Sequence, residues 1–241
     1  MPIPFLTTHW RNLLVATYAA PEELLVKYLP TGVELDLRDG RAFCSLVGFQ
    51  FQSTSVFGIP SPCLNNFPEW NLRIYVRRGE KRGIHFVREF VPHRLVTWAG
   101  RLTFNEPFKT ALVTVDVKTD GGVLNVDYYV TRGGRTHRLS ASADAATSAA
   151  TDTEAHFTDL YWGFGESREF RIERPAWEMH RLRQFDIDVD WAELYGPDWA
   201  GLNGRKPESV CLSAGSRVKV FTPSTPRVSA GFALPPAIRG A

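Results

Sequence analysis

Residues 111–134 read ALVTVDVKTDGGVLNVDYYVTRGG, and this stretch decides the fold class. Apolar residues alternate with polar ones on both sides of Gly121-Gly122, and a second glycine pair, Gly133-Gly134, follows the second run. Alternation with a period of two is typical of a strand with one buried face, and paired glycines supply the positive φ angles of a tight hairpin. The stretch therefore predicts two antiparallel strands, over 111–118 and 123–131.

The same pattern continues along much of the chain. Turn signals such as Asp39-Gly40 and Arg78-Gly79-Glu80 separate further short β-like runs, which we place at residues 42–51, 71–77, 85–90 and 96–104. Short helices are expected after Pro21, after the capping-box pair Thr151-x-x-Glu154, and over 190–195. The prediction is a mainly β (α+β) protein.

Length and composition restrict the class of protein. A chain of 241 residues without a low-complexity linker fits one domain over 1–241. A net charge of +2 argues against nucleic acid as a partner, and the apolar runs are far shorter than the ~20 residues of a membrane-spanning helix. The start shows no secretory signal, so we expect a cytoplasmic protein. Cys44, Cys63 and Cys211 are widely spaced and are expected to be free thiols.

Familiar catalytic signatures are absent from the sequence. It has no Gly-x-Ser-x-Gly elbow, no phosphate-binding glycine loop and no His-Glu-x-x-His, and its six histidines never fall at metal-ligand spacing. We therefore predict no metal and no cofactor. His85 and His93 lie eight residues apart around an alternating run, which would place both on one face if no bulge intervenes. The alternative is a pair of hydrogen-bonded structural histidines.

Four runs carry a resemblance to a known superfamily. They are LLVATYAAPEELLVKYLP at 13–30, FPEWNLRIYVR at 67–77, HFTDLYWGF at 156–164 and AELYG at 192–196. Their order and spacing resemble the acetoacetate decarboxylase-like superfamily, and within it the YqjF-like branch, also called DUF2071. The resemblance covers nearly the whole chain. It implies an antiparallel β-barrel with a few short flanking helices and a central cavity.

The resemblance also implies a changed active site. Acetoacetate decarboxylases carry Arg-Glu-x-x-x-Pro-Lys-Lys. The first lysine forms an imine with the substrate and the second helps to lower its pKa, and this enzyme is itself a standard example of such a lysine. Here His93 takes the place of that lysine and Arg94 that of its neighbour, while Glu89 is retained. The superfamily's arginine after the first-strand tyrosine is replaced by Ala19, and Glu69 matches a superfamily glutamate. Imidazole cannot form a Schiff base, so decarboxylation through an imine is not expected.

Three interpretations of these residues stay open. In the first, His93 is a general acid or base, Arg94 or Arg73 holds an anionic substrate and Glu69 or Glu89 orients it, in lyase or hydro-lyase chemistry on a keto acid or similar carbonyl compound. In the second, the cavity only binds a small apolar or acidic ligand. In the third, Glu89 and Arg94 form a structural ion pair.

The expected partners are few. We expect a small-molecule ligand, with His85 added to Arg94 and Arg73 as candidate ligand-binding residues, and no nucleic acid or membrane. The aromatic spacing of Trp191, Tyr195 and Trp199 indicates either internal packing or a subunit interface, and we expect a homo-oligomer of two or more subunits.

Overall fold

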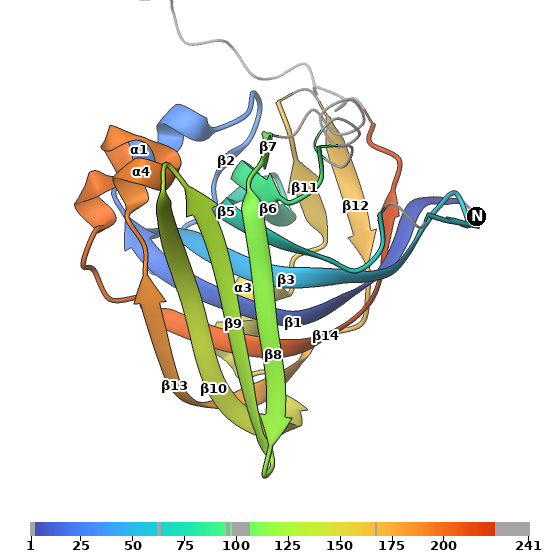
Figure 1. Ribbon diagram of the computed structural model, residues 1–241. Coiled ribbons are helices and arrows are strands. Elements are labelled where there is room, and N and C mark those ends of the chain that lie inside the picture. Colours follow the sequence, from blue (N-terminus) through green and yellow to red (C-terminus); the bar gives the residue numbers. More distant parts are fainter. Residues whose placement is uncertain (1–2, 62–63, 95–96, 98–106, 167, 225–241) are drawn as a thin grey trace, which may run out of the picture.

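The computed structural model describes residues 3–61, 64–94, 97, 107–166 and 168–224, and it shows a mainly β protein (Figure 1). The strands are β1 (Pro4–Ala20), β2 (Glu34–Leu35), β3 (Ala42–Val56), β4 (Ile59–Pro60), β5 (Phe67–Arg78), β6 (Lys81–Val91), β7 (Phe108–Thr110), β8 (Leu112–Asp120), β9 (Val123–Arg132), β10 (Arg135–Ala149), β11 (Trp162–Phe164), β12 (Glu169–Glu173), β13 (Glu178–Asp188) and β14 (Ser209–Phe221). The helices are α1 (Glu22–Leu25), α3 (Asp152–Thr158) and α4 (Trp191–Tyr195), with 3-10 turns η1 (Val26–Tyr28) and η3 (Pro197–Leu202).

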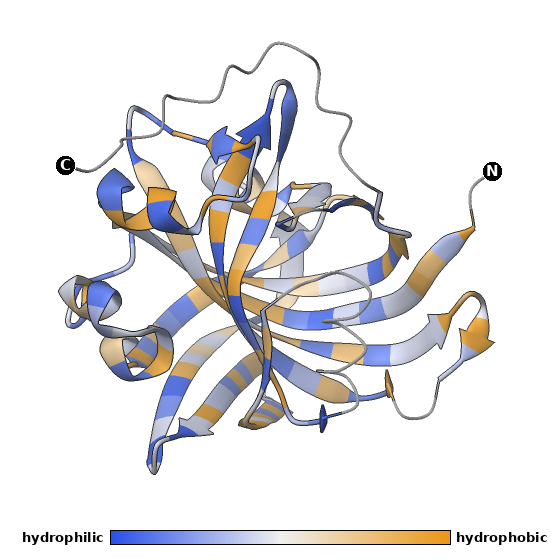
Figure 2. Cartoon of the chain, turned by 90° about the horizontal axis from the view of Figure 1, so that it is seen from above, coloured by the Kyte–Doolittle hydropathy of each residue, from blue (hydrophilic) through white to orange (hydrophobic). Residues whose placement is uncertain are grey.

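The sheet closes into a ring. Strands β1, β3, β5, β6, β11, β12 and β14 pair in that order, and β14 pairs back onto β1 from Pro4↔Phe221 to Thr17↔Ser209. The pairings are antiparallel except that β7 and β11 run parallel to β6. Because each strand alternates its side chains between two faces, one set of residues points into the ring and the other points out of it. Figure 2 shows the resulting alternation of hydrophobic and hydrophilic residues along the strands.

A second layer covers one outer face of the ring. Strands β13, β10, β9 and β8 continue the sheet from β14 and cross in front of the ring strands (Figure 1). The main hydrophobic core lies between the two layers. Tyr128 of β9 is fully buried there, and its hydroxyl donates a hydrogen bond to the carbonyl of Asn12 at 2.9 Å. Its ring lies against Gly48 of β3, where a Cβ would come within 2.5 Å of it, so only glycine fits.

The predicted hairpin that opens this layer is confirmed. Strands β8 and β9 pair from Leu112↔Thr131 to Asp120↔Val123, and Gly121 and Gly122 have φ angles of 53° and 78°. These are the left-handed angles that a tight turn requires and that glycine adopts without steric cost. The strand predicted over 96–104 lies outside the described residues except for Thr97. There the prediction is wrong, because Thr97 is helical and its backbone N–H donates to the carbonyl of His93 at 3.1 Å.

The helices behave largely as their sequence signals predict. Thr151 and Glu154 form the predicted capping box at the start of α3. The helix expected over 190–195 is α4, which Asp190 caps by accepting the Glu193 backbone N–H at 3.1 Å. Its Trp191 and Tyr195, like Trp199 of η3, are buried in the main core.

The cysteines of the described ranges are buried, and the helices there are short. Cys44 and Cys211 are buried free thiols, whereas Cys63 lies outside the described residues. None of the helices in the described ranges has the length and apolar character needed to cross a membrane.

Candidate active site

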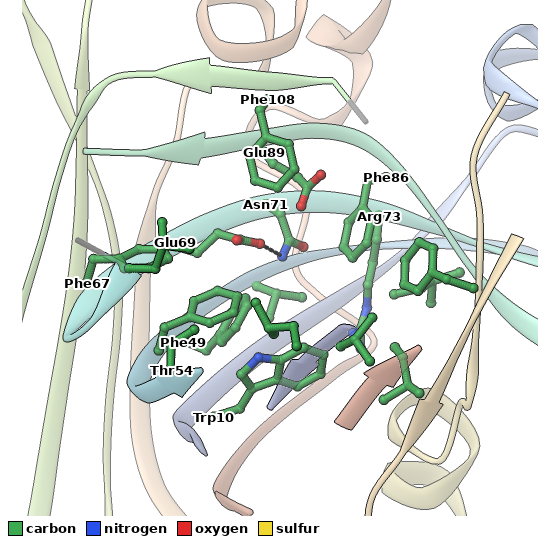
Figure 3. Close-up of a pocket in the computed structure, with 18 of the residues that line it drawn as sticks. Trp10, Phe49, Thr54, Phe67, Glu69, Asn71, Arg73, Phe86, Glu89 and Phe108 are labelled. Atoms are coloured by element: carbon green, nitrogen blue, oxygen red, sulfur yellow. Dashed lines mark hydrogen bonds between the residues drawn. The ribbon is translucent and has the colours of Figure 1, made fainter. Parts of the chain in front are cut away.

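A cavity of about 150 Å³ lies inside the ring. Every ring strand except β11 contributes to its wall, which is mostly apolar and includes Trp10, Leu13, Val47, Phe49, Phe86 and Ile172 (Figure 3). Apolar protein cavities of about this volume hold a molecule the size of benzene. The cavity is therefore suited to a small ligand.

Three polar side chains enter this apolar cavity from one strand. Glu69, Asn71 and Arg73 occupy alternate positions of β5, so all three point into the ring (Figure 3). The residues between them, Trp70 and Leu72, point outwards into the main core. The side chains of Glu69, Asn71 and Arg73 are at most 7% exposed, although burying such groups is costly unless they are paired.

Two carboxyl groups meet at one end of this polar row. Glu89 of β6 lies directly across from Asn71 in the strand pairing and is also buried in the cavity wall. Burial raises the pKa of Glu69 to about 7, against the opposing effect of its hydrogen bonds with Asn71 and Glu89. Two carboxyl groups buried in one cavity wall are costly to ionise together, so near neutral pH one of them can hold a proton while the other accepts one.

Asn71 connects the acidic pair to the rest of the cavity. Its Nδ2 donates a hydrogen bond to Glu69 Oε1 at 2.9 Å (Figure 3). That bond fixes the amide orientation and leaves Oδ1 buried without a hydrogen-bond partner among the described residues. Asn71 therefore presents a hydrogen-bond acceptor inside the cavity.

Arg73 supplies positive charge at the other end of the row. Its Nη2 donates to the carbonyl of Phe157 at 3.0 Å, and its guanidinium lies 5.7 Å from the centre of the Tyr75 ring. Within the described part of the chain, Arg73 has no carboxylate partner within 4 Å, and its buried Nε has no hydrogen-bond acceptor. A carboxylate is the group that would satisfy both the charge and the free donor of a guanidinium buried in this way.

A β-bulge separates His85 from the cavity. The pairing of β5 with β6 shifts between Leu72↔Arg88 and Arg73↔Phe86, so β6 has one extra residue, Val87, at this point. Glu89 and Phe86 therefore face the cavity, whereas His85 points to the opposite face. There its Nδ1–H donates to the carbonyl of Phe164 at 2.7 Å, and burial lowers the pKa of the imidazole. The structure does not bring His85 to the site, and this bulge breaks the condition under which it would share a face with His93.

His93 and Arg94 also lie away from the cavity lining. Strand β6 ends at Val91, and both residues follow it with exposed side chains. The His93 ring lies 6.0 Å from that of Phe67, which does line the cavity, so His93 sits near its edge. The structure thus groups Glu69, Glu89 and Arg73 of the predicted residues and leaves His93, Arg94 and His85 outside the group.

Three residues with polar groups line the cavity but were not predicted from the sequence. They are Thr54, Asn71 and Trp10, and the buried Nε1 of Trp10 also lacks a hydrogen-bond partner among the described residues. The signal for Asn71 was present, because Glu69, Asn71 and Arg73 are polar at every second position of an otherwise apolar strand. In the described ranges no lysine lines the cavity, and no three His, Cys, Asp or Glu residues are grouped to hold a metal ion.

Comparison with known structures supports the fold. Acetoacetate decarboxylase from Legionella pneumophila aligns with a TM-score of 0.67 at 12% identity, covering 94% of this chain and 88% of that one. An acetoacetate decarboxylase-like enzyme from Sphingomonas wittichii RW1 aligns at 0.61 with 16% identity, covering 91% and 93%. The enduracididine biosynthesis enzyme MppR, complexed with the condensation product of pyruvate and imidazole 4-carboxaldehyde, aligns at 0.63 with 13% identity, covering 93% and 90%. At these identities the likeness shows a shared fold.

Sequence comparison identifies a relative of this chain and the family to which it belongs. The uncharacterized protein YqjF of Bacillus subtilis (strain 168) is 29% identical over 154 residues, a match that spans 64% of this chain and 62% of the length of YqjF. Residues 7–217 match the family DUF2071, described as an uncharacterized conserved protein. Because this match spans most of the chain, the chain belongs to the DUF2071 family.

Proposed function

We propose that the cavity binds a small keto acid or a similar anionic carbonyl compound, and that Glu69 and Glu89 catalyse proton transfer at the carbon next to its carbonyl. The observation that carries this proposal is the convergence of two buried carboxyl groups, Glu69 with its pKa raised to about 7 by burial, and a buried guanidinium on one small apolar cavity. Such a combination of an acid, a base and a charge anchor is what enolisation requires.

The charges in the cavity orient the ligand. Glu69 and Arg73 are four residues apart on β5, which separates their backbones by roughly 13 Å. The ligand carboxylate binds Arg73, since the negative charge of the carboxyl pair repels it from the other end. The carbonyl and its neighbouring carbon then lie towards Glu69 and Glu89.

The proton transfer needs no further reagent. The ionised carboxylate removes a proton from the carbon next to the carbonyl, and the protonated carboxyl gives its proton to the carbonyl oxygen. One C–H bond breaks, one O–H bond forms, and the pair again holds one proton on the other member. The reaction is a keto–enol exchange, which does not require the lysine imine that is absent from the described cavity wall.

Exchange of carbon-bound hydrogen in D₂O tests the proposal. We expect ¹H NMR to show loss of the C–H signals of pyruvate or 2-oxobutanoate near neutral pH with the wild-type protein. Glu69→Gln and Glu89→Gln should each slow the exchange by about 10²- to 10⁴-fold. Glu80→Gln, at the exposed turn between β5 and β6, is the matched control and should exchange like the wild type.

Two results separate the alternatives. Binding of the keto acid without enzyme-dependent exchange would mean that the cavity is a ligand-binding site without catalysis. A covalent adduct on any lysine after borohydride treatment with a keto acid would contradict the mechanism without an imine.

A further inference from the structure

We infer that Asn71 accepts a hydrogen bond from a hydroxyl group of the ligand, so that the cavity favours the enol or hydroxy form of a small anionic compound over its keto form. The inference rests on the proposed function and specifies which chemical form the same site prefers.

The orientation of the Asn71 amide is the first step. The side chain is 2% exposed, and one of its two Nδ2 hydrogens is donated to Glu69 Oε1. The acceptor of this amide, Oδ1, has no partner among the described residues and can only accept a hydrogen bond. A ketone or a carboxylate also offers only acceptors, so a keto acid leaves Oδ1 unsatisfied. A hydroxyl group satisfies it.

The neighbouring donors place the rest of the ligand. Arg73 Nε and Trp10 Nε1 are buried donors without acceptors among the described residues, and both residues line the cavity. Asn71 and Arg73 are two residues apart on β5, which corresponds to roughly 7 Å. A ligand that satisfies both Asn71 and Arg73 has a carboxylate that binds Arg73 and, a few bonds away, a hydroxyl group that donates to Asn71. The cavity of about 150 Å³ limits it to a small molecule.

This arrangement has a consequence for catalysis. The carbonyl oxygen of a bound keto acid has no proton to offer Asn71, whereas the enol formed by proton transfer carries an O–H group. Asn71 Oδ1 is therefore satisfied only after the oxygen has been protonated. Interactions that form along the reaction and are missing in the bound substrate are those that increase the rate. Asn71 would thus touch the reacting oxygen and stabilise the enol.

Paired ligands test this preference directly. Isothermal titration calorimetry of the wild-type protein would compare lactate with pyruvate and 2-hydroxybutanoate with 2-oxobutanoate, since each pair differs only at the hydroxyl-bearing carbon. We expect the hydroxy acid of each pair to bind roughly five- to 100-fold more tightly, the range for satisfying one buried acceptor. This comparison needs no variant.

A variant then assigns the preference to one residue. In Asn71→Leu the two members of each pair should bind equally, because the acceptor is gone. Asn125→Leu is the matched control, since Asn125 lies on β9 outside the cavity lining, and it should keep the wild-type preference.

The outcomes distinguish this inference from the function on which it rests. Keto acids that bind as tightly as hydroxy acids to the wild type, or a preference that persists in Asn71→Leu, would overturn the role of Asn71. The proposed function would still stand if Glu69→Gln abolished hydrogen exchange. Failure of both members of every pair to bind at millimolar concentration would overturn both.

Discussion

Replacing Glu69 with glutamine should change how the stability of the protein depends on pH. In the folded protein burial raises the pKa of Glu69 to about 7 from an ordinary value of 4.5. The folded state therefore binds a proton that the unfolded state has released between these two values. Stability linked to Glu69 is fully present below about pH 4.5 and is lost as the pH rises through about 7.

The shift sets the size of the effect. A pKa rise from 4.5 to about 7 corresponds to a loss of about 3 kcal/mol in the free energy of unfolding across that pH range, because each unit is worth about 1.4 kcal/mol. Glutamine has nearly the same shape as the protonated acid, keeps an oxygen for the Asn71 amide and does not titrate. Glu69→Gln should therefore be about 3 kcal/mol more stable relative to the wild type at pH 8 than at pH 5.

Urea unfolding followed by circular dichroism at several pH values between 5 and 8 measures this difference. The Glu80→Gln protein controls for the general loss of one carboxylate, since Glu80 is exposed at a turn, and its stability should follow the wild-type curve. A constant difference between wild type and Glu69→Gln across this range would refute the elevated pKa and, with it, the proton-sharing carboxyl pair.

Three further changes test the packing, the anion site and a helix cap. Gly48→Ala should lower the free energy of unfolding by about 1–3 kcal/mol, because a Cβ at this position would meet the Tyr128 ring at 2.5 Å. Gly201→Ala is the control and should change the free energy of unfolding by less than about 1 kcal/mol, because a Cβ there would have nothing within 4 Å. Equal losses for the two variants in thermal or urea unfolding would contradict this reasoning. Arg73→Met should weaken pyruvate binding by about 10- to 100-fold in calorimetry while the stability stays within about 1 kcal/mol, and unchanged affinity would exclude Arg73 as the anion site. Thr151→Ala should cost about 1 kcal/mol in urea unfolding because it removes the α3 cap, and Thr151→Ser should restore most of it; no difference between the two would exclude a capping contribution.

Strands β5 and β6 differ in how well their sequences predict which side chains reach the cavity. In β5 the alternation of polar Glu69, Asn71 and Arg73 with apolar residues is regular, and the structure places all three side chains on one face. In β6 one extra residue, Val87, shifts the alternation of side chains between the two faces. Counting every second residue from His85 to His93 therefore does not identify residues on the same face. A bulge of this kind arises from pairing with a neighbouring strand and has no clear signature in the strand's own sequence.

The end of β6 shows a second limit. The motif comparison places His93 at the position of the imine-forming lysine of acetoacetate decarboxylases, but strand β6 ends at Val91 and His93 is exposed. Where a strand stops depends on which neighbours continue to hydrogen-bond with it. The position of His93 in the motif predicts a catalytic role, but a motif does not specify where a side chain lies relative to the cavity.

The sequence alone determined the local structure and the chemical content of this protein. Its alternating runs, paired glycines and capping box specify strands, tight turns and helix starts, because these features depend on residues only a few positions apart. Only the tertiary structure decided the site. Closure of the ring pairs β1, near the start of the chain, with β14, near its end, and it creates the cavity in which Glu69, Glu89 and Arg73 are buried together. Burial and proximity between distant segments are properties of the packed ring, so they could be established only once its strands were placed.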